Sequence, residues 1–91
     1  MNIDALRTFI EVIETGSLVG AARRLNVTQS TVTARMDRLE EEVGQKLLHR
    51  YKSGAELTSA GFTFQRYAEL MLQGWRRAKS EASLPEGVTG A

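Results

Sequence analysis

The stretch AARRLNVTQSTVTARMDRLEEEVG, residues 21 to 44, contains two helical patterns in quick succession and decides the fold. Apolar residues spaced three and four apart predict one helix that ends near Leu25 and another that begins after Thr28. Small residues on the apolar face of the first helix allow a neighbouring helix to approach closely. The inner face of the second helix is predicted to consist of Val32, Met36, Leu39 and Val43.

The junction between these helices has the pattern of a tight turn. Asn26 stands where the chain must reverse, and asparagine tolerates the left-handed conformation better than most residues. Thr28 is a natural N-cap for the following helix, and Gly44 is a natural C-terminal cap. Ala22 and Val32 supply the small and the branched apolar residue that two crossing helices require. Residues 18 to 37 are therefore predicted to form a helix-turn-helix.

The rest of the chain completes a mainly α architecture. An apolar stripe predicts a first helix over roughly residues 4 to 14, and Ser17 is expected to cap the second. Between Gln45 and Thr58 the helical period fails, and two short strands around a glycine-containing turn are predicted, forming a wing over about 47–57. A long last helix is predicted over 60–82. We therefore expect a winged helix-turn-helix, with a three-helix core plus a two-stranded wing, followed by a long linker or dimerisation helix. The expected divisions are 1–58, 59–82 and a disordered tail at 83–91.

Composition narrows the function classes. The 91 residues suit a single small domain, and 42% hydrophobic with 25% charged residues is ordinary for a globular protein. The absence of cysteine and of a long apolar run leads us to expect a cytoplasmic protein without a metal, cofactor or membrane partner. The net charge is only +1, but residues 23 to 52 contain seven Lys or Arg and four acids. The three acids Glu40-Glu41-Glu42 cannot share one helix face, because adjacent helical residues point in different directions. We interpret them as a solvated charge run, with pairing of Glu40 to Arg35, Arg38 or a partner subunit as the alternative.

The outer face of the predicted third helix suggests double-stranded DNA as the partner. The N-terminal end of a recognition helix enters the major groove, where short donors and acceptors match base edges. Basic and hydroxyl side chains nearby suit phosphates. The residues expected to read bases are Gln29, Ser30, Thr31, Thr33 and Arg35. Those expected at phosphates are Thr28, Arg38, His49 and Lys52.

Two longer segments resemble the DNA-binding domain of LysR-type bacterial transcriptional regulators. These are LRTFIEVIETGSLVGAARRLNVTQSTVTARMDRLEEEVGQKLLHR, residues 6 to 50, and LTSAG, residues 57 to 61. The resemblance implies that Gln29 contacts DNA with Ser30 and Thr33 beside it, and that Arg50 of the wing lies along the DNA backbone. It also implies a homodimer on an inverted repeat, paired through the last helix. The apolar residues expected in that interface are Phe64, Tyr67, Met71, Trp75 and Ala78.

The chain departs from the family pattern at several positions. Ser30 replaces a common proline, Ala34 a frequent basic residue, Leu48 the usual phenylalanine, and Ser53 a second wing arginine. Full regulators of this family carry an additional effector-binding domain, so a small-molecule effector is expected only through a domain outside this chain. We expect the chain to be a fragment of such a regulator, with a naturally short protein as the alternative.

Other functions receive less support from the sequence. The single histidine, His49, lies between Leu48 and Arg50, and no glycine-rich phosphate loop or paired carboxylates suggest catalysis, so no enzyme is expected. The alternative function is a dimerisation or protein-interaction module that sequesters a full-length regulator, because the long helix has an apolar stripe that usually finds a partner.

Overall fold

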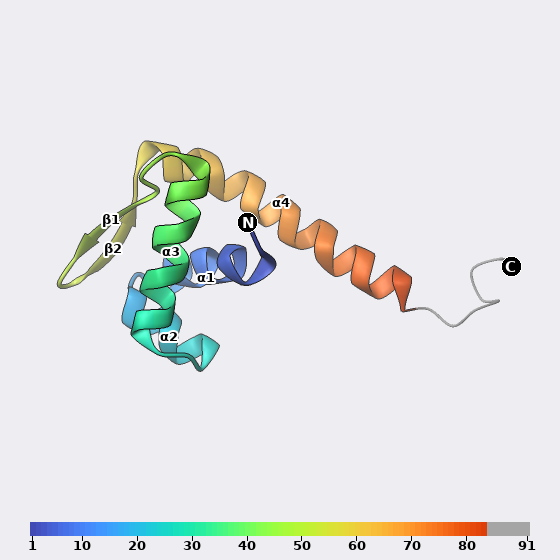
Figure 1. The fold of residues 1–91 in the computed structure, drawn as a ribbon, viewed down its shortest axis with the longest axis horizontal. Helices are drawn as coiled ribbons and strands as arrows, with labels where there is room; N and C mark the ends of the chain where they lie inside the picture. The colour runs from blue at the N-terminus through green and yellow to red at the C-terminus, as the bar shows by residue number, and fades with distance from the viewer. Residues whose placement is uncertain (84–91) are drawn as a thin grey trace, which may run out of the picture.

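The computed structural model describes residues 1 to 83. Its elements are α1 (Ile3–Thr15), α2 (Leu18–Leu25), α3 (Gln29–Val43), β1 (Leu48–Tyr51), β2 (Gly54–Leu57) and α4 (Ser59–Ala82). The first three helices form a group, the hairpin projects from one side of it, and α4 runs away on the other side (Figure 1). The predicted winged helix-turn-helix with a long last helix is confirmed. The proposed divisions at 58 and 82 stay a prediction, and the expected tail falls, apart from Ser83, outside the described residues.

The helices begin and end where local chemistry satisfies their free backbone groups. The Ser17 side chain accepts from the Gly20 amide, and the Thr28 side chain accepts from the Thr31 amide, as N-caps do. Asn26 is left-handed, with φ 57° and ψ 45°, and its amide bonds back to α2. Gly44 ends α3 and also has a left-handed backbone conformation, with φ 80°. The caps predicted at these four positions are confirmed.

Helix α1 lies at the centre of the core, in contact with α2, α3 and α4. Phe9 is fully buried, and its ring meets the ring of Phe64 edge to face at 5.6 Å between centroids. Ala21 and Ala22 are buried on α2, consistent with the close helix approach that small side chains permit. The buried apolar residues are Ala5, Leu6, Phe9, Val12, Ala21, Ala22, Val32, Met36, Leu39, Leu47, Leu48, Ala68 and Leu72.

The wing is attached to the turn between α1 and α2 by its second strand. The Ala55 amide donates to the Gly16 carbonyl at 2.8 Å. Gly54 passes so close to this carbonyl that a Cβ at position 54 would lie 2.5 Å from the Gly16 oxygen. Glycine is therefore required at position 54 for the wing to dock on the helices.

Helix α4 belongs to the core only over its first half. Ala68 and Leu72 are buried, and Phe64 and Met71 pack against the core, whereas residues 73 to 83 are exposed. At 1.5 Å per residue its 24 residues extend about 36 Å. The second half therefore leaves the three-helix group as a free rod (Figure 1). Within residues 1 to 83, no helix combines the length and the apolar character needed to cross a membrane.

Candidate nucleic-acid interface

The N-terminal end of α3 presents a cluster of hydroxyl groups. The Thr28 hydroxyl oxygen lies 3.0 Å from that of Ser30 and 2.9 Å from that of Thr31. Gln29 and Ser30 are exposed, and Thr33 is half-buried. Because Thr28 also caps the helix, one threonine both ends the turn and orients its neighbours. This end of α3 thus offers short donors and acceptors to solvent, as a helix that reads base edges requires.

Gln29 faces the tip of the wing and the start of α2 across a hollow of ≈ 310 Å³. Ser17, the N-cap of α2, and Val19 of α2 line one side of it, and Tyr51 and Lys52 line it from the wing. The start of α2 and the tip of the wing therefore meet at the N-terminal end of α3. The sequence predictions missed Ser17, Val19 and Tyr51 as members of this surface. An exposed aromatic residue between two cations, Arg50-Tyr51-Lys52, was the available signal for Tyr51.

Arg35 lies four residues after Thr31, on the same face of α3, and points away from Gln29 and Ser30. Its Nη1 donates to the hydroxyl of Thr8 on α1 at 3.2 Å, and Thr8 is fully buried. The Thr8 hydroxyl in turn donates to the Asp4 carbonyl at 2.6 Å. Arg35 therefore links the recognition helix to α1, and the structure does not bring it together with Gln29 and Ser30.

Arg38 is largely exposed, with 79% of its side chain accessible, and its Nε lies 3.9 Å from Glu42. Glu42 also accepts a hydrogen bond from the N-terminal ammonium group of Met1. That hydrogen bond lowers the pKa of Glu42 below its usual value, and the ammonium and Arg38 charges act in the same direction. Arg38 is thus accessible to a phosphate but sits at the end of α3 remote from Gln29.

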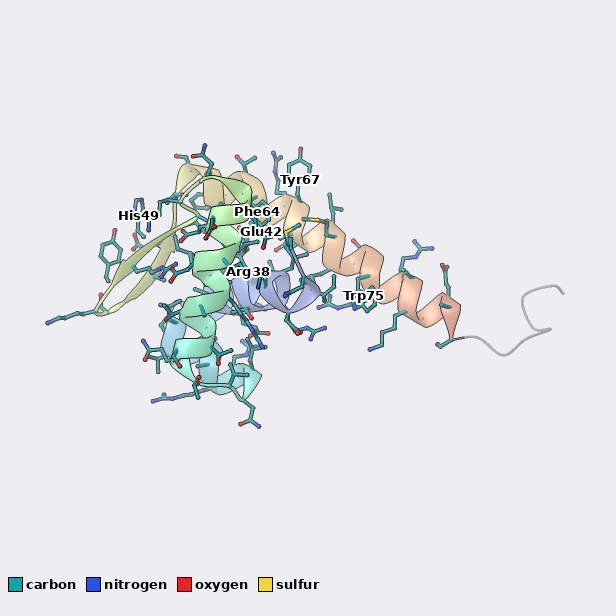
Figure 2. All side chains as sticks on the ribbon, viewed as in Figure 1. Arg38, Glu42, His49, Phe64, Tyr67 and Trp75 are labelled. Atoms are coloured by element: carbon teal, nitrogen blue, oxygen red, sulfur yellow. The ribbon has the colours of Figure 1, made fainter. Side chains whose placement is uncertain are left out.

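The wing has an inner and an outer face because side chains alternate along a strand. In the antiparallel hairpin, Leu48 pairs with Leu57 and His49 pairs with Glu56. Leu48 is buried, whereas His49 and Tyr51 are exposed and their ring centroids lie 6.4 Å apart. Figure 2 shows His49 on the outer side of the hairpin. His49, Tyr51 and Lys52 therefore lie on the accessible surface of the wing, together with Ser53 and Glu56.

Glu40 is not part of a solvated charge run, and that interpretation was wrong. Glu40 is only 9% exposed, and its Oε2 accepts hydrogen bonds from the amides of Leu47 and Leu48 at 2.7 and 3.1 Å. Its Oε1 accepts from Nη2 of Arg50 at 2.8 Å. Helix periodicity could not reveal this, because the partners of Glu40 belong to the segment and strand that follow α3. Glu41 and Glu42 are exposed as expected.

The apolar residues predicted for a dimer interface divide into two groups. Phe64 and Met71 pack against the core of their own chain. Tyr67, Trp75 and Ala78 are exposed, Tyr67 to 56% and Trp75 to 43%. Figure 2 shows Tyr67 projecting away from the core and Trp75 farther along α4. The free surface of α4 also includes Leu70, which is 61% exposed and which the predictions omitted.

Comparison with known proteins identifies the family. Residues 3–62 match the model of the bacterial regulatory helix-turn-helix proteins of the lysR family. The chain is 41% identical over 81 residues to the HTH-type transcriptional regulator HdfR of Yersinia pestis, covering 89% of this chain and 28% of HdfR. The chain thus spans just over a quarter of the length of the curated relatives it matches.

Solved structures agree with this assignment. The CbnR DNA-binding domain in complex with DNA superposes with a TM-score of 0.87 at 38% identity, over 90% of this chain and 94% of that one. Full-length CbnR complexed with its target DNA superposes with a TM-score of 0.86, also at 38% identity, over 90% of this chain and 28% of that one. Because the family model, the sequence of a curated relative and the fold of solved structures all match, this chain belongs to the lysR family of bacterial regulatory helix-turn-helix proteins, as a DNA-binding domain.

Proposed function

We propose that this domain inserts the N-terminal end of α3 into the major groove of double-stranded DNA and lays the wing along the backbone. Gln29, Ser30 and Thr33 read base edges, with Thr31 supporting them through the hydroxyl cluster. Arg35 does not belong to this reading set, because its guanidinium group donates to Thr8. The groups that contact phosphates include Thr28, Arg38, His49 and Lys52, joined by Tyr51.

One observation carries this proposal: Gln29, the start of α2 and the tip of the wing surround a single hollow. A duplex that contacts the wing tip therefore lies against the first turn of α3. Base-edge readers and phosphate contacts are then arranged on one side of the molecule, as sequence-specific DNA binding requires. The CbnR structures, which are complexes with DNA, support DNA binding by this chain.

We also propose that the domain acts as a homodimer on an inverted repeat, paired through the free face of α4. Tyr67, Leu70 and Trp75 leave apolar surface in solvent, and such surface is usually covered by a partner. A two-fold pair would present two copies of α3 to half-sites about one helical turn apart. Phe64 and Met71 contribute indirectly, since they hold α4 against its own core.

A mobility-shift titration of the 91-residue chain, run at several salt concentrations, tests the proposal. The probes are a random duplex and a pool selected for binding. We expect a selected palindrome, two chains per site, and an affinity that falls steeply with salt because phosphates release counterions. Binding of equal strength to both probes would refute sequence-specific reading by the isolated chain.

The exposed apolar side chains of α4 favour a second candidate function. In that case the chain pairs with a full-length regulator and sequesters it, without contacting DNA. Scrambling Gln29, Ser30 and Thr33 separates the two functions, because it abolishes DNA binding and leaves pairing through α4 intact. No shift of either probe at low salt, together with retained pairing, would support sequestration.

A further inference from the structure

Arg50 is the wing residue whose expected contact with the DNA backbone fits the structure least. It occupies the same strand face as Leu48, which is buried, whereas His49 and Tyr51 occupy the opposite face. Only 24% of the Arg50 side chain is accessible, and its Nε is buried. The residue therefore points toward α3 while its two neighbours in the strand point to solvent.

Both terminal nitrogens of Arg50 already have acidic partners on the recognition helix. Nη1 lies 2.8 Å from Asp37, and Nη2 donates to Glu40 at 2.8 Å. One cation between two carboxylates gives this trio a net charge of −1. A phosphate approaching Arg50 would have to share its terminal nitrogens with these two carboxylates and would face their net negative charge.

Glu40 extends the connection to the backbone of the wing. Its second oxygen accepts from the amides of Leu47 and Leu48, at the point where the chain enters β1. One carboxylate thus holds both the start of the strand and the arginine at its third position. Buried charges of this kind are tolerated when they are paired and hydrogen-bonded, and removing one partner leaves the other uncompensated.

We propose that Arg50 is a positioning residue: it fixes the wing to the recognition helix through Asp37 and Glu40 and does not itself contact phosphate. The inference rests on the proposed function, because the wing it positions is the one that lies along DNA. Phosphates are then contacted by the outward residues His49, Tyr51 and Lys52. The Arg50 trio, which consists of Arg50, Asp37 and Glu40, sets the distance between these residues and the N-terminal end of α3.

The two roles of Arg50 predict opposite effects for Glu40→Gln. If Arg50 contacted phosphate, removing a competing carboxylate would strengthen DNA binding. If Arg50 positions the wing, Glu40→Gln weakens binding to the selected duplex by about tenfold, and Arg50→Gln does the same. The double variant then loses less affinity than the product of the two single losses, because both variants remove the shared Glu40–Arg50 contact. Losses that multiply in the double variant, or tighter binding by Glu40→Gln, would overturn the proposal.

Arg50→Lys provides an independent discrimination. Lysine retains a positive charge for a phosphate but cannot bind two carboxylates through a planar fork. We expect Arg50→Lys to bind DNA as weakly as Arg50→Gln. Glu41→Gln is the matched control, since it removes the same charge from an exposed neighbour of Glu40, and its affinity should stay within about twofold of the parent. Affinity retained by Arg50→Lys would contradict the positioning role.

Amide spectra of the DNA-free protein separate failure of this inference from failure of the proposed function. Arg50→Gln and Asp37→Asn should shift the amide signals of Leu47 and Leu48, whereas Glu41→Gln should not. Asp37 has 61% of its side chain exposed, so its variant serves if Glu40→Gln does not fold. In that case, the binding titration compares Asp37→Asn, Arg50→Gln and their double variant in place of the set with Glu40→Gln. Unmoved wing amides would refute the positioning role even if the parent chain did not bind DNA.

Discussion

A single hydroxyl group at Thr28 performs two tasks. It accepts the Thr31 amide that would otherwise lack a partner, and it lies within hydrogen-bonding distance of the Ser30 and Thr31 hydroxyls. Its neighbours are therefore oriented before DNA arrives, which lowers the entropy lost when they bind. Gln29 has no hydrogen bond within this cluster and is exposed, which suits the base contact that we propose for it.

Base reading and phosphate contact should respond differently to truncation. We expect Gln29→Ala to cost about 1–3 kcal/mol of binding free energy and to relax preference at one base position, because a bidentate contact with adenine is lost. Lys52→Ala should weaken binding to all sequences alike and reduce the salt slope by about one. Affinities for the selected duplex and its single-base variants measure both effects. A uniform loss across sequences for both variants would contradict these roles.

The N-terminal ammonium group should control the titration of Glu42. Its hydrogen bond holds the pKa of Glu42 below the usual value. The stabilisation from this contact is therefore complete above the unfolded-state pKa and is lost as pH falls through the lowered one. Acetylating Met1 should move the Glu42 midpoint upward, as followed by the NMR shift of its carboxyl carbon. Arg38→Gln is the control and should produce a smaller upward movement. An unchanged midpoint after acetylation would contradict the contact.

Single-residue roles were predictable where the cause lay nearby in the sequence. The caps at Ser17 and Thr28 and the turn at Asn26 depend on backbone groups within a few residues. The burial of Glu40 and the contact of Arg35 with α1 were not foreseen, because their partners, the Leu47 and Leu48 amides and Thr8, come from other parts of the chain. No periodicity within α3 contains that information.

At the scale of elements, the helices follow from apolar spacing and from the residues at their ends. The expected first helix, 4 to 14, is one residue shorter than α1 at each end. The expected last helix, 60 to 82, begins one residue after α4 does and ends at the same residue. The pairing of the two strands was predicted from the sequence, but the attachment of the hairpin to the turn between α1 and α2 was not. Docking of Ala55 on Gly16 joins residues 39 positions apart, so only the folded chain reveals it.

Two glycine-to-alanine substitutions should have opposite effects on stability. Gly74 lies in the exposed part of α4, and Gly44 ends α3 with φ 80°; neither site has an atom within 4 Å of an added Cβ. Gly74→Ala should raise the free energy of unfolding by about 1 kcal/mol, through helix propensity. Gly44→Ala should lower it by about 1–2 kcal/mol, because alanine is strained in the left-handed region. Urea unfolding at a fixed protein concentration measures both. Changes of the same sign would show that helix conformation does not account for them.

The whole molecule combines a compact group of three helices with a long helical arm, α4. Helix α1 ties both parts together, because it contacts α2 and α3 on one side of the core and α4 on the other. The pattern along α4 predicted an apolar stripe, but it did not separate the residues that pack on α1 from those left in solvent. That division depends on where the three-helix group ends, which is a property of the assembled fold.

Pairing through α4 should be sensitive to charge at one exposed position. Tyr67→Glu should convert dimers to monomers, because it places a carboxylate on the apolar face that we propose a partner covers. Gln73→Glu is the matched control, since it adds the same charge to an exposed position on another side of the helix. Sedimentation velocity over a range of concentrations measures the change. A Tyr67→Glu chain that dimerises as the parent does would exclude this face as the interface.

The position of the Arg50 trio on α3 has a consequence for engineering. Residues 29 to 33, which we propose read bases, occupy the first turns of the helix, whereas Asp37 and Glu40 hold the wing from later turns. The two tasks thus occupy separate segments of one helix. Exchanging residues 28 to 34 for those of another regulator, with Val32 retained for the core, should transplant specificity as a cassette and leave the wing in its own register.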